Sequence, residues 1–322
     1  MSLAAAIADA TRALPVAGDP PDAPAMLALL RLLYATGRRD LPLGRLFEGH
    51  VDARQIVARY GTPAQAAAAQ AEGAILGVWN ADLPGEGLTL AGDRIDGGKS
   101  FASGAGLVTH ALVTADLGGQ RQLLLVDLAR TPPAIEGDWW RVMGMHRSET
   151  HRVRWRHAPV AAADRIGAAG DYVREPYFSG GALRFAAVQA GGIAGLVDRV
   201  RDHLVAAGRA ADPHQSGRLA ALHAAAEAAA GAVRTAAAAW FTGGDDETRL
   251  AHVAAARAAV YAQGGAAITL AQEAVGLEGL FLDHPLCPHL TDLMVYLRQP
   301  GPDAQRMRVG AAVAAGRLRA DL

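Results

Sequence analysis

The chain has few of the features that mark secreted, membrane-embedded or nucleic-acid-binding proteins. Cys287 is the only cysteine among 322 residues, so no intrachain disulfide can form, which fits a reducing compartment. The formal net charge is −1, and no basic stripe indicates nucleic acid or anionic lipid as a partner. No apolar run approaches the ~20 residues of a membrane span. The start, 1–14, carries Asp9 and no basic residue, which predicts a short helix and not a signal peptide. We therefore expect a cytoplasmic protein.

Apolar and small residues are abundant, and they fall into three stretches of different pattern. Hydrophobic residues make up 51% of the chain, enough for a large core. Residues 1–72 have a helical pattern, 73–160 alternate short β-like runs with glycine-rich turns, and 161–322 return to helix. We predict an N-terminal helical domain, a central β domain and a C-terminal helical bundle over these ranges.

The elements predicted within these domains define an α+β fold. Apolar residues at helical spacing predict N-terminal helices, one of them over 43–60. Short β-like runs separated by turns predict an antiparallel β domain, with strands at 75–79, 88–90, 106–114, 122–126 and 152–155. Long periodic stretches with short connections predict an up-down four-helix bundle, with helices at 184–207, 218–240, 248–274 and 285–298.

Four motifs in and around the β domain carry a family resemblance. They are Gly77–Gly85 (GVWNADLPG), Gly98–Ala105 (GKSFASGA), Met143–Thr150 (MGMHRSET) and Ala158–Val160 (APV). In this order and at this spacing they resemble the flavin-holding middle domain of the acyl-CoA dehydrogenase family. The resemblance implies that family's order of helical, β and helical domains, and FAD as cofactor. Only about 70 residues precede the β domain, so the N-terminal helical domain is shortened relative to the family.

The resemblance implies three residues around the flavin ring. Phe101 matches the family's aromatic residue against the ring, and Ser103 matches the hydroxyl near N5. Asn80 matches a position near the pyrimidine edge, where an amide can also donate a hydrogen bond. A flavin needs such a flat apolar wall and such donors. The alternative is that Phe101 is a core aromatic and Ser103 belongs to a turn.

A fourth cofactor contact follows from the same resemblance. Arg209 lies near the place where the family has an arginine that reaches the FAD diphosphate of a neighbouring subunit, and a guanidinium recognises phosphate with a planar donor fork. The family's following Phe-Gly pair is absent, and Asp212–Gln215 (DPHQ) stands in its place. A solvated arginine at a helix end is the alternative.

The acids that would complete the family's chemistry are missing. Removal of the proton α to a thioester needs a positioned carboxylate. The family takes it from one of two places, which fall here at Leu183 and at Leu297–Pro302 (LRQPGP), and neither holds an acid. Asp303 is the nearest downstream carboxylate and a weak catalytic candidate; a helix N-cap or a solvated acid is the alternative.

A run of metal-ligand residue types near the C-terminus is not expected to hold a metal. Asp283–His289 (DHPLCPH) has no second Cys or His pair at the spacing of a zinc site, and two prolines stiffen it. It predicts a loop that leads into a helix.

Two functional hypotheses remain open from the sequence. The first is an FAD-dependent oxidoreductase of the acyl-CoA dehydrogenase-like type. Its substrate is an unknown small or carrier-bound molecule, and acyl-CoA thioesters are among the candidates. The second is a flavin-binding or flavin-free partner subunit that has lost acyl-CoA dehydrogenation. The retained Phe101 and Ser103 favour the first, and the missing base favours the second. The family's FAD site implies a homodimer or homotetramer.

Overall fold

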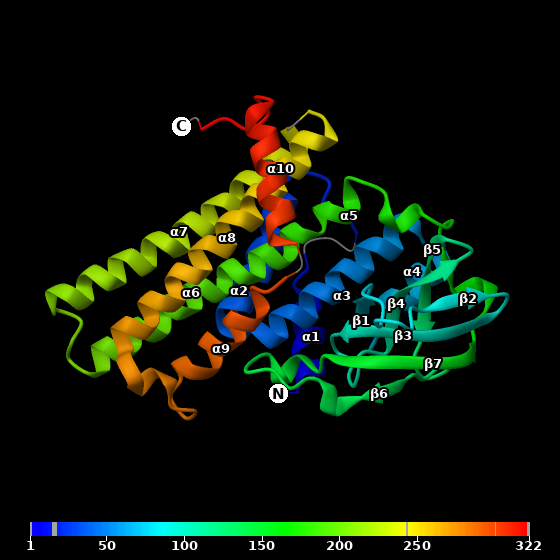
Figure 1. Cartoon of the computed structure of the whole chain (residues 1–322), viewed down its shortest axis with the longest axis horizontal. Helices are drawn as coiled ribbons and strands as arrows, with labels where there is room; N and C mark the ends of the chain where they lie inside the picture. Colours follow the sequence, from blue (N-terminus) through cyan, green and yellow to red (C-terminus); the bar gives the residue numbers. More distant parts are fainter. Residues whose placement is uncertain (1, 15–17, 243, 300, 321–322) are drawn as a thin grey trace. The chain divides into compact units, whose positions relative to one another are not determined.

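A computed structural model describes residues 2–14, 18–242, 244–299 and 301–320 of the chain (Figure 1). The contacts divide the chain into two compact units. The first comprises Met1–Pro20, Arg45–Val142 and His146–Phe178, and the second comprises Pro21–Gly44, Met143–Met145 and Ser179–Leu322. The predicted fold class is confirmed, because helices precede a largely antiparallel sheet and a helical bundle follows it. The three-domain division itself stays a prediction.

The N-terminal helices begin where side chains can cap them. Ser2 caps α1 by accepting from the Ala5 amide, and Asp22 caps α2 by accepting from the Ala25 amide. Before α4, Thr62 and Gln65 form a reciprocal capping box. These caps set the starts of helices that the sequence predicted; the N-terminal helices are α1 (Leu3–Arg12), α2 (Ala23–Arg39), α3 (Leu41–Tyr60) and α4 (Pro63–Gln70).

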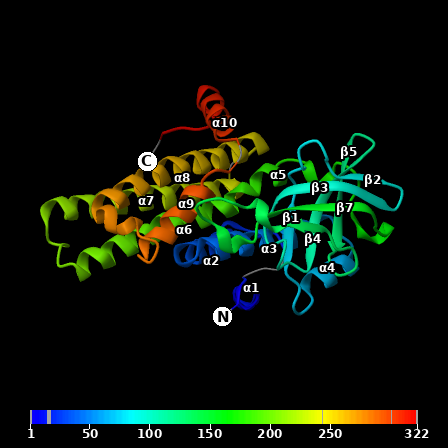
Figure 2. The same cartoon turned by 60° about the horizontal axis from the view of Figure 1, so that its bottom comes forward.

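The first unit contains an eight-stranded sheet. Its order is β6-β7-β3-β2-β4-β5-β8, and β1 pairs in parallel with β4. Figure 2 shows β3 and β7 running side by side across the sheet. The strands are β1 (Leu76–Trp79), β2 (Thr89–Ala91), β3 (Arg94–Ala102), β4 (His110–Leu117), β5 (Gln120–Asp127), β6 (Ala134–Glu136), β7 (His151–Pro159) and β8 (Arg165–Ile166).

The strand predictions missed β3 and the short β6 and β8, and they displaced β4. The sequence Gly97-Gly98-Lys99 lacks the β-branched and aromatic residues that signal a strand, yet it forms the middle of β3. The strand predicted at 106–114 begins only at His110, because the amides of Leu107 and Val108 both donate to the Gly104 carbonyl in a tight turn.

Helices of the first unit cover part of its sheet. Side chains from the second half of α3 and from α4 pack on β1, β4, β5 and β8 in one apolar cluster. Its fully covered members include Ala53 of α3 and Leu112 of β4. Burial of this apolar area stabilises the unit by the hydrophobic effect and fixes which face of each strand points inward.

The second unit combines α2 with the C-terminal helical bundle, and among the described residues this bundle has five helices, one more than the sequence predicted. Both figures show α6, α7 and α8 side by side (Figures 1 and 2). Alanine, the best helix former, fills much of α7 and α8, which reach 30 residues each. The fifth helix, α10, was not expected because prolines surround its start. After the short α5 (Tyr177–Gly180), the bundle helices are α6 (Ala182–Ala206), α7 (Pro213–Thr242), α8 (Asp246–Val275), α9 (Leu286–Tyr296) and α10 (Pro302–Ala314).

Glycines let α2 and α6 approach until their backbones touch. A Cβ at Gly191 would lie 2.0 Å from the Tyr34 carbonyl oxygen, and one at Gly37 would lie 2.2 Å from the Val188 carbonyl oxygen. Neither position leaves room for any side chain. Arg38 adds a bidentate ion pair to Asp198, at 2.6 and 2.8 Å. Backbone contact therefore fixes the crossing of α2 and α6, and the Arg38–Asp198 ion pair adds an electrostatic contact between them.

The apolar α6 is a core helix. By length and composition alone, the stretch Tyr177–Ala206 is long and apolar enough to span a membrane. The sequence analysis predicted no such segment. However, 72% of its most apolar window is buried inside the protein. Burial against other helices accounts for its composition.

We predict that Gly191→Ala will lower the free energy of unfolding by about 3 kcal/mol, because the added methyl group meets a backbone atom that cannot move aside. Gly265→Ala is the matched control. Gly265 also lies within a long helix, but nothing stands within 4 Å of an added Cβ, so alanine there is expected to stabilise by about 0.5–1 kcal/mol. Urea denaturation measures both; equal effects of the two substitutions would refute the steric account.

Candidate functional site

Strand β3 ends in an exposed aromatic residue with unusual backbone geometry. Phe101 has φ 54°, in the left-handed region that non-glycine residues rarely adopt. Its side chain is 55% exposed, while the preceding residues Gly97–Ser100 are buried or nearly so. A strained backbone that presents an apolar ring to the surface is a typical mark of a functional site. The structure therefore does not place Phe101 in the core, which was the alternative interpretation.

Two tryptophans form an aromatic cluster with Phe101, which the sequence analysis did not predict. The ring centroid of Trp139 lies 5.1 Å from that of Phe101, edge to face, and that of Trp140 lies 6.3 Å away. The Arg152 guanidinium stands over the Trp139 ring at 4.8 Å. The adjacent Trp139-Trp140 pair follows the Pro132-Pro133 turn. Two consecutive large aromatic residues near a turn were the sequence signal that could have indicated this cluster. We call Phe101, Trp139 and Trp140 the aromatic wall.

A chain of hydroxyl groups leads to Ser103, two residues after Phe101. Ser148 and Thr150 share a hydrogen bond of 2.8 Å, and the Thr150 hydroxyl donates to the Ser103 hydroxyl oxygen at 3.0 Å. Ser103 thus receives one hydrogen bond and keeps its own proton for another acceptor. The Ser103 carbonyl also accepts from the buried Trp79 indole N–H at 3.0 Å, which fixes the backbone at this point.

Asn80 follows β1 and presents one end of its amide. Its Oδ1 accepts from Thr114 at 3.0 Å and from Arg121 at 2.9 Å. Within the ranges that the structure describes, no hydrogen bond of the Asn80 Nδ2 group is found, and that group is not buried. Because both donors hold the oxygen, the NH₂ group is the end available to a ligand acceptor.

A fully buried lysine, Lys99, connects β3 with the residues around Asn80. The sequence analysis assigned it no role. Lys99 of β3 has no exposed surface, and its Nζ donates to the Asp82 carboxylate at 2.5 Å and to the Thr114 hydroxyl at 2.9 Å. Burial lowers the pKa of Lys99, and the hydrogen bond to Asp82 opposes that shift. Since Thr114 in turn donates to Asn80, the ammonium group orients the Asn80 amide through one hydroxyl. No sequence signal distinguishes this lysine from a solvated one.

The arrangement fits a flavin ring. The Phe101 ring is exposed and apolar, with the two tryptophan rings set edge-on to it, the Ser103 hydroxyl can donate a hydrogen bond, and the Asn80 amide can donate a second one. These are the groups that an isoalloxazine ring needs from a protein. Phe101, Ser103 and Asn80 all belong to the first unit, and the structure brings them into it through β3 and β1.

The other candidate residues lie in the second unit. Arg209 is exposed directly after α6, and its amide donates to the Leu204 carbonyl. Asp303 lies in the first turn of α10, where its side chain is 84% exposed and pairs with Arg306 at 3.0 Å. Gly301 and not Asp303 is the N-cap residue. Leu183 is buried in α6.

In the second place where the family has its base, the described residues are Leu297–Gln299, Gly301 and Pro302, none of them acidic. Pro300 lies outside the described residues. Asp292 of α9 accepts a hydrogen bond from the Met145 amide and so has a structural partner.

The Asp283–His289 run forms the predicted loop into α9. His284 accepts from the Leu286 amide through Nδ1 at 3.1 Å, and its Nε2 lies 3.2 Å from Nδ1 of His203. Glu278 completes a group whose possible ligand atoms lie within 4.8 Å of one another. The Leu286 bond places the proton of the neutral His284 ring on Nε2, directed at His203. The two histidines thus form a hydrogen-bonded pair.

The fold is that of the acyl-CoA dehydrogenase-like flavoproteins. Dibenzothiophene monooxygenase TdsC from Paenibacillus sp. A11-2 matches with a TM-score of 0.81 and 18% identity over 98% of this chain and 90% of that one. Butyryl-CoA dehydrogenase from Megasphaera elsdenii matches with 0.77 and 19% over 97% and 88%. KijD3 matches with 0.76 and 19% over 92% and 81%. No protein-family model matches the chain, and no curated protein does.

We predict that Asp82→Asn will lower the free energy of unfolding by about 2 kcal/mol, because it leaves the buried Lys99 ammonium without its counter-charge; the usual cost is discounted because Asp82 is 42% exposed. The double variant Lys99→Met with Asp82→Asn should recover part of this loss. Asp93→Asn, which removes a 78%-exposed carboxylate, is the control and should change stability by less than about 0.5 kcal/mol. Urea denaturation of all variants makes the comparison; an Asp82 effect no larger than the control would contradict it.

Proposed function

We propose that the protein is a flavin-dependent oxidoreductase of the acyl-CoA dehydrogenase-like type that acts on a small or carrier-bound substrate. The observation that carries the proposal is the exposed Phe101 ring at positive φ, in contact with Trp139 and Trp140 and followed two residues later by the Ser103 hydroxyl. Structures of the fold neighbours support it, since TdsC is crystallised with FMN and indole and KijD3 with FMN.

The residues of this chain have distinct roles in such a site. A bound flavin supplies a hydride acceptor at its N5 atom. Phe101 supports the ring through apolar contact, Ser103 donates to an acceptor beside it, and Asn80 donates at a second edge. Trp139 and Trp140 enlarge the apolar surface and exclude water from it. Lys99 and Thr114 hold the Asn80 amide in one orientation without touching the ligand.

The finer proposal is that the flavin is FAD. It is supported by Arg209, an exposed guanidinium after α6, at the position that the resemblance pairs with the FAD diphosphate. FMN is the competing cofactor, because it accompanies two of the fold neighbours.

A second candidate function is a partner subunit without its own catalysis. It is supported by one specific observation: in the described part of the chain, neither position of the family base carries an acid, and Asp303 is exposed and paired with Arg306. Such a protein would bind flavin or none, and would not oxidise a thioester.

We predict that the purified protein takes up FAD and that Phe101→Ala weakens the affinity about tenfold, because one aromatic face is lost. Phe178→Ala removes a partly exposed phenylalanine that packs on Tyr172 and serves as the control. Flavin absorbance and fluorescence titration with FAD and with FMN give the affinities. Failure of the wild type to bind either flavin would refute the proposal, and preference for FMN would refute only its finer form.

We also predict that saturated acyl-CoA thioesters do not reduce the flavin at a useful rate, because a positioned general base is worth ~10²–10⁴ in rate and neither family base position, Leu183 or Leu297–Pro302, holds an acid. The measurement is anaerobic bleaching of the flavin with short and medium acyl-CoAs, in wild type and Asp303→Asn. Rapid bleaching in the wild type that disappears in Asp303→Asn would overturn the prediction and identify Asp303 as the base.

We further propose that the protein forms a homodimer or homotetramer. Four large apolar side chains on and after the 3₁₀ turn Gly276–Leu280 are exposed, by 76% at Leu277 and 91% at Leu282, with Leu280 and Phe281 between them. An exposed apolar patch of this kind favours an interface. Light scattering with FAD present should show a dimer or tetramer at micromolar concentration, and Leu282→Glu should weaken it. A monomeric wild type would exclude the assembly.

A further inference from the structure

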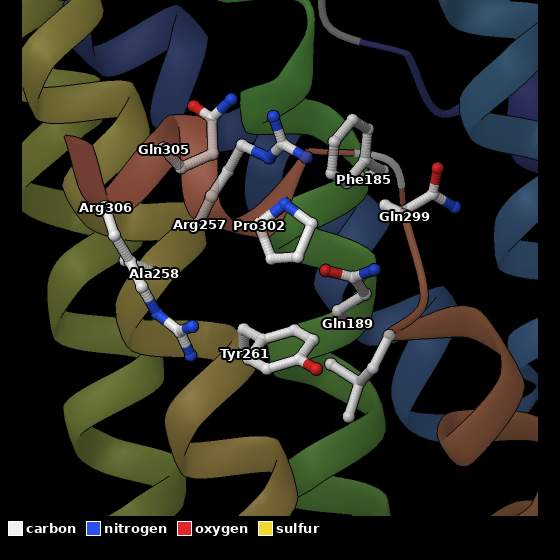
Figure 3. A pocket seen from close by; sticks show the side chains of 10 residues that line it. Phe185, Gln189, Arg257, Ala258, Tyr261, Gln299, Pro302, Gln305 and Arg306 are labelled. Carbon is white, nitrogen blue, oxygen red and sulfur yellow. The ribbon is translucent and has the colours of Figure 1, made fainter. Parts of the chain in front are cut away.

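A small pocket of the second unit, lined mainly by side chains of α6, α8 and α10, is too small for a ligand (Figure 3). Its cavity volume of about 20 Å³ leaves room for about one water molecule. Another group of polar side chains in this unit lies where the end of α6 meets the segment between α8 and α9. This group needs no cavity to act as a site, because a metal ion occupies only the space between its ligand atoms.

Three side chains with metal-ligand chemistry meet there. They are His203 in the last turn of α6, Glu278 in the 3₁₀ turn Gly276–Leu280, and His284 in the loop that leads into α9. One possible ligand atom from each lies within 4.8 Å of the other two. The run Asp283–His289 was not expected to hold a metal, because the run itself lacks a second ligand pair. The fold supplies the further ligands from two other elements.

The two imidazole nitrogens are already separated as two ligands of one ion are. Nδ1 of His203 lies 3.2 Å from Nε2 of His284, and the two ring planes are inclined at 67°. With Zn–N bonds of about 2.0–2.1 Å, two nitrogens of a tetrahedral site lie about 3.3–3.4 Å apart. Glu278 is exposed, so its carboxylate can turn toward the nitrogens without disturbing the core.

The backbone that carries the two histidines is held by close packing. Nε2 of His289 on α9 donates to the Gly192 carbonyl of α6 at 2.8 Å, and a Cβ at Gly195 would lie 2.4 Å from the same nitrogen. A Cβ at Gly279 in the 3₁₀ turn would lie 2.9 Å from the Leu286 side chain at the start of α9. Because α6, α9 and the turn pack this closely, the possible ligands are brought together before any ion binds.

Metal binding moves one proton and costs one hydrogen bond. The Leu286 amide donates to Nδ1 of His284 at 3.1 Å, so the ring proton of His284 is on Nε2. When Nε2 binds an ion, the ring carries its proton on Nδ1 instead, and the Leu286 amide loses this acceptor. His203 already has the lone pair of its Nδ1 directed at the site and keeps its proton on Nε2. Two metal–nitrogen bonds and a carboxylate ligand outweigh one backbone hydrogen bond.

We propose that His203, Glu278 and His284 bind one divalent transition-metal ion, with water in the fourth position. Imidazole nitrogens favour Zn²⁺ and its neighbours over Mg²⁺ or Ca²⁺, and two histidines with one glutamate are a known ligand set for zinc. The bound ion ties the end of α6 to the segment between α8 and α9, and it stabilises the folded protein because it binds the folded state. The site does not depend on the flavin, because all three ligands belong to the second unit.

The test uses the full-length protein without a purification tag, after removal of metal with a chelator. Calorimetric titration with Zn²⁺ is expected to show one saturable site per chain, and Zn²⁺ is expected to raise the Tm. The variants His203→Gln, Glu278→Gln and His284→Gln are each expected to bind Zn²⁺ at least tenfold more weakly, because each lacks one ligand. The visible spectrum of bound Co²⁺ gives an independent measure of coordination and is expected to change in the same variants.

His223→Gln and Glu273→Gln are the matched controls. They remove the same side-chain types from exposed positions on α7 and α8, outside the group of possible ligands, and should bind Zn²⁺ as the wild type does. Glu278 is exposed, so Glu278→Gln tests the site even if a histidine variant does not fold. The proposal is wrong if the folded wild type shows no saturable Zn²⁺ binding, or if His223→Gln weakens binding as much as His284→Gln.

Discussion

The site depends on the neutralisation of one buried charge. An ammonium group with no exposed surface is tolerated only when acceptors surround it, so the positions of Asp82 and Thr114 relative to Lys99 are tightly constrained. Through Thr114 the constraint reaches Asn80, and along β3 it reaches Phe101 two residues further on. Residues from β1, β3 and β4 are thereby held in one register. A rigid support of this kind is what a binding surface needs in order to keep its geometry without the ligand.

The sequence predicted the parts of the fold that depend on local interactions. Helix starts follow from caps such as Thr62 with Gln65, and long alanine-rich stretches identify the bundle. Strand β3 was missed because its glycines have no side chains to report an alternation, and its conformation is decided by pairing with β7. Helix α10 was missed because prolines suggest an end, although Pro302 stands where a helix tolerates proline.

The motif order predicted Phe101, Ser103 and Asn80 as cofactor-binding residues, but the structure around them could not be predicted. Trp139 and Trp140 reach Phe101 through the fold, and no local pattern shows that contact. The burial of Lys99 is likewise invisible in a sequence, because it depends on acceptors 15 and 17 residues away. The lack of an acid at both family base positions can be seen in the sequence alone, because it concerns residue types and not their arrangement. One fold supports many reactions, so function has to be argued from these particular groups.

The glycine contacts between α2 and α6 have a consequence for motion. Where Gly37 and Gly191 bring carbonyl oxygens against the opposing backbone, the two helices can neither slide nor rotate past each other without collision. A hinge therefore cannot lie between them, and any displacement of α6 must carry α2 with it as one rigid body. The chain runs directly from α2 through Asp40 into α3, which ends in the first unit. A displacement of α6 and α2 would therefore also move the start of α3.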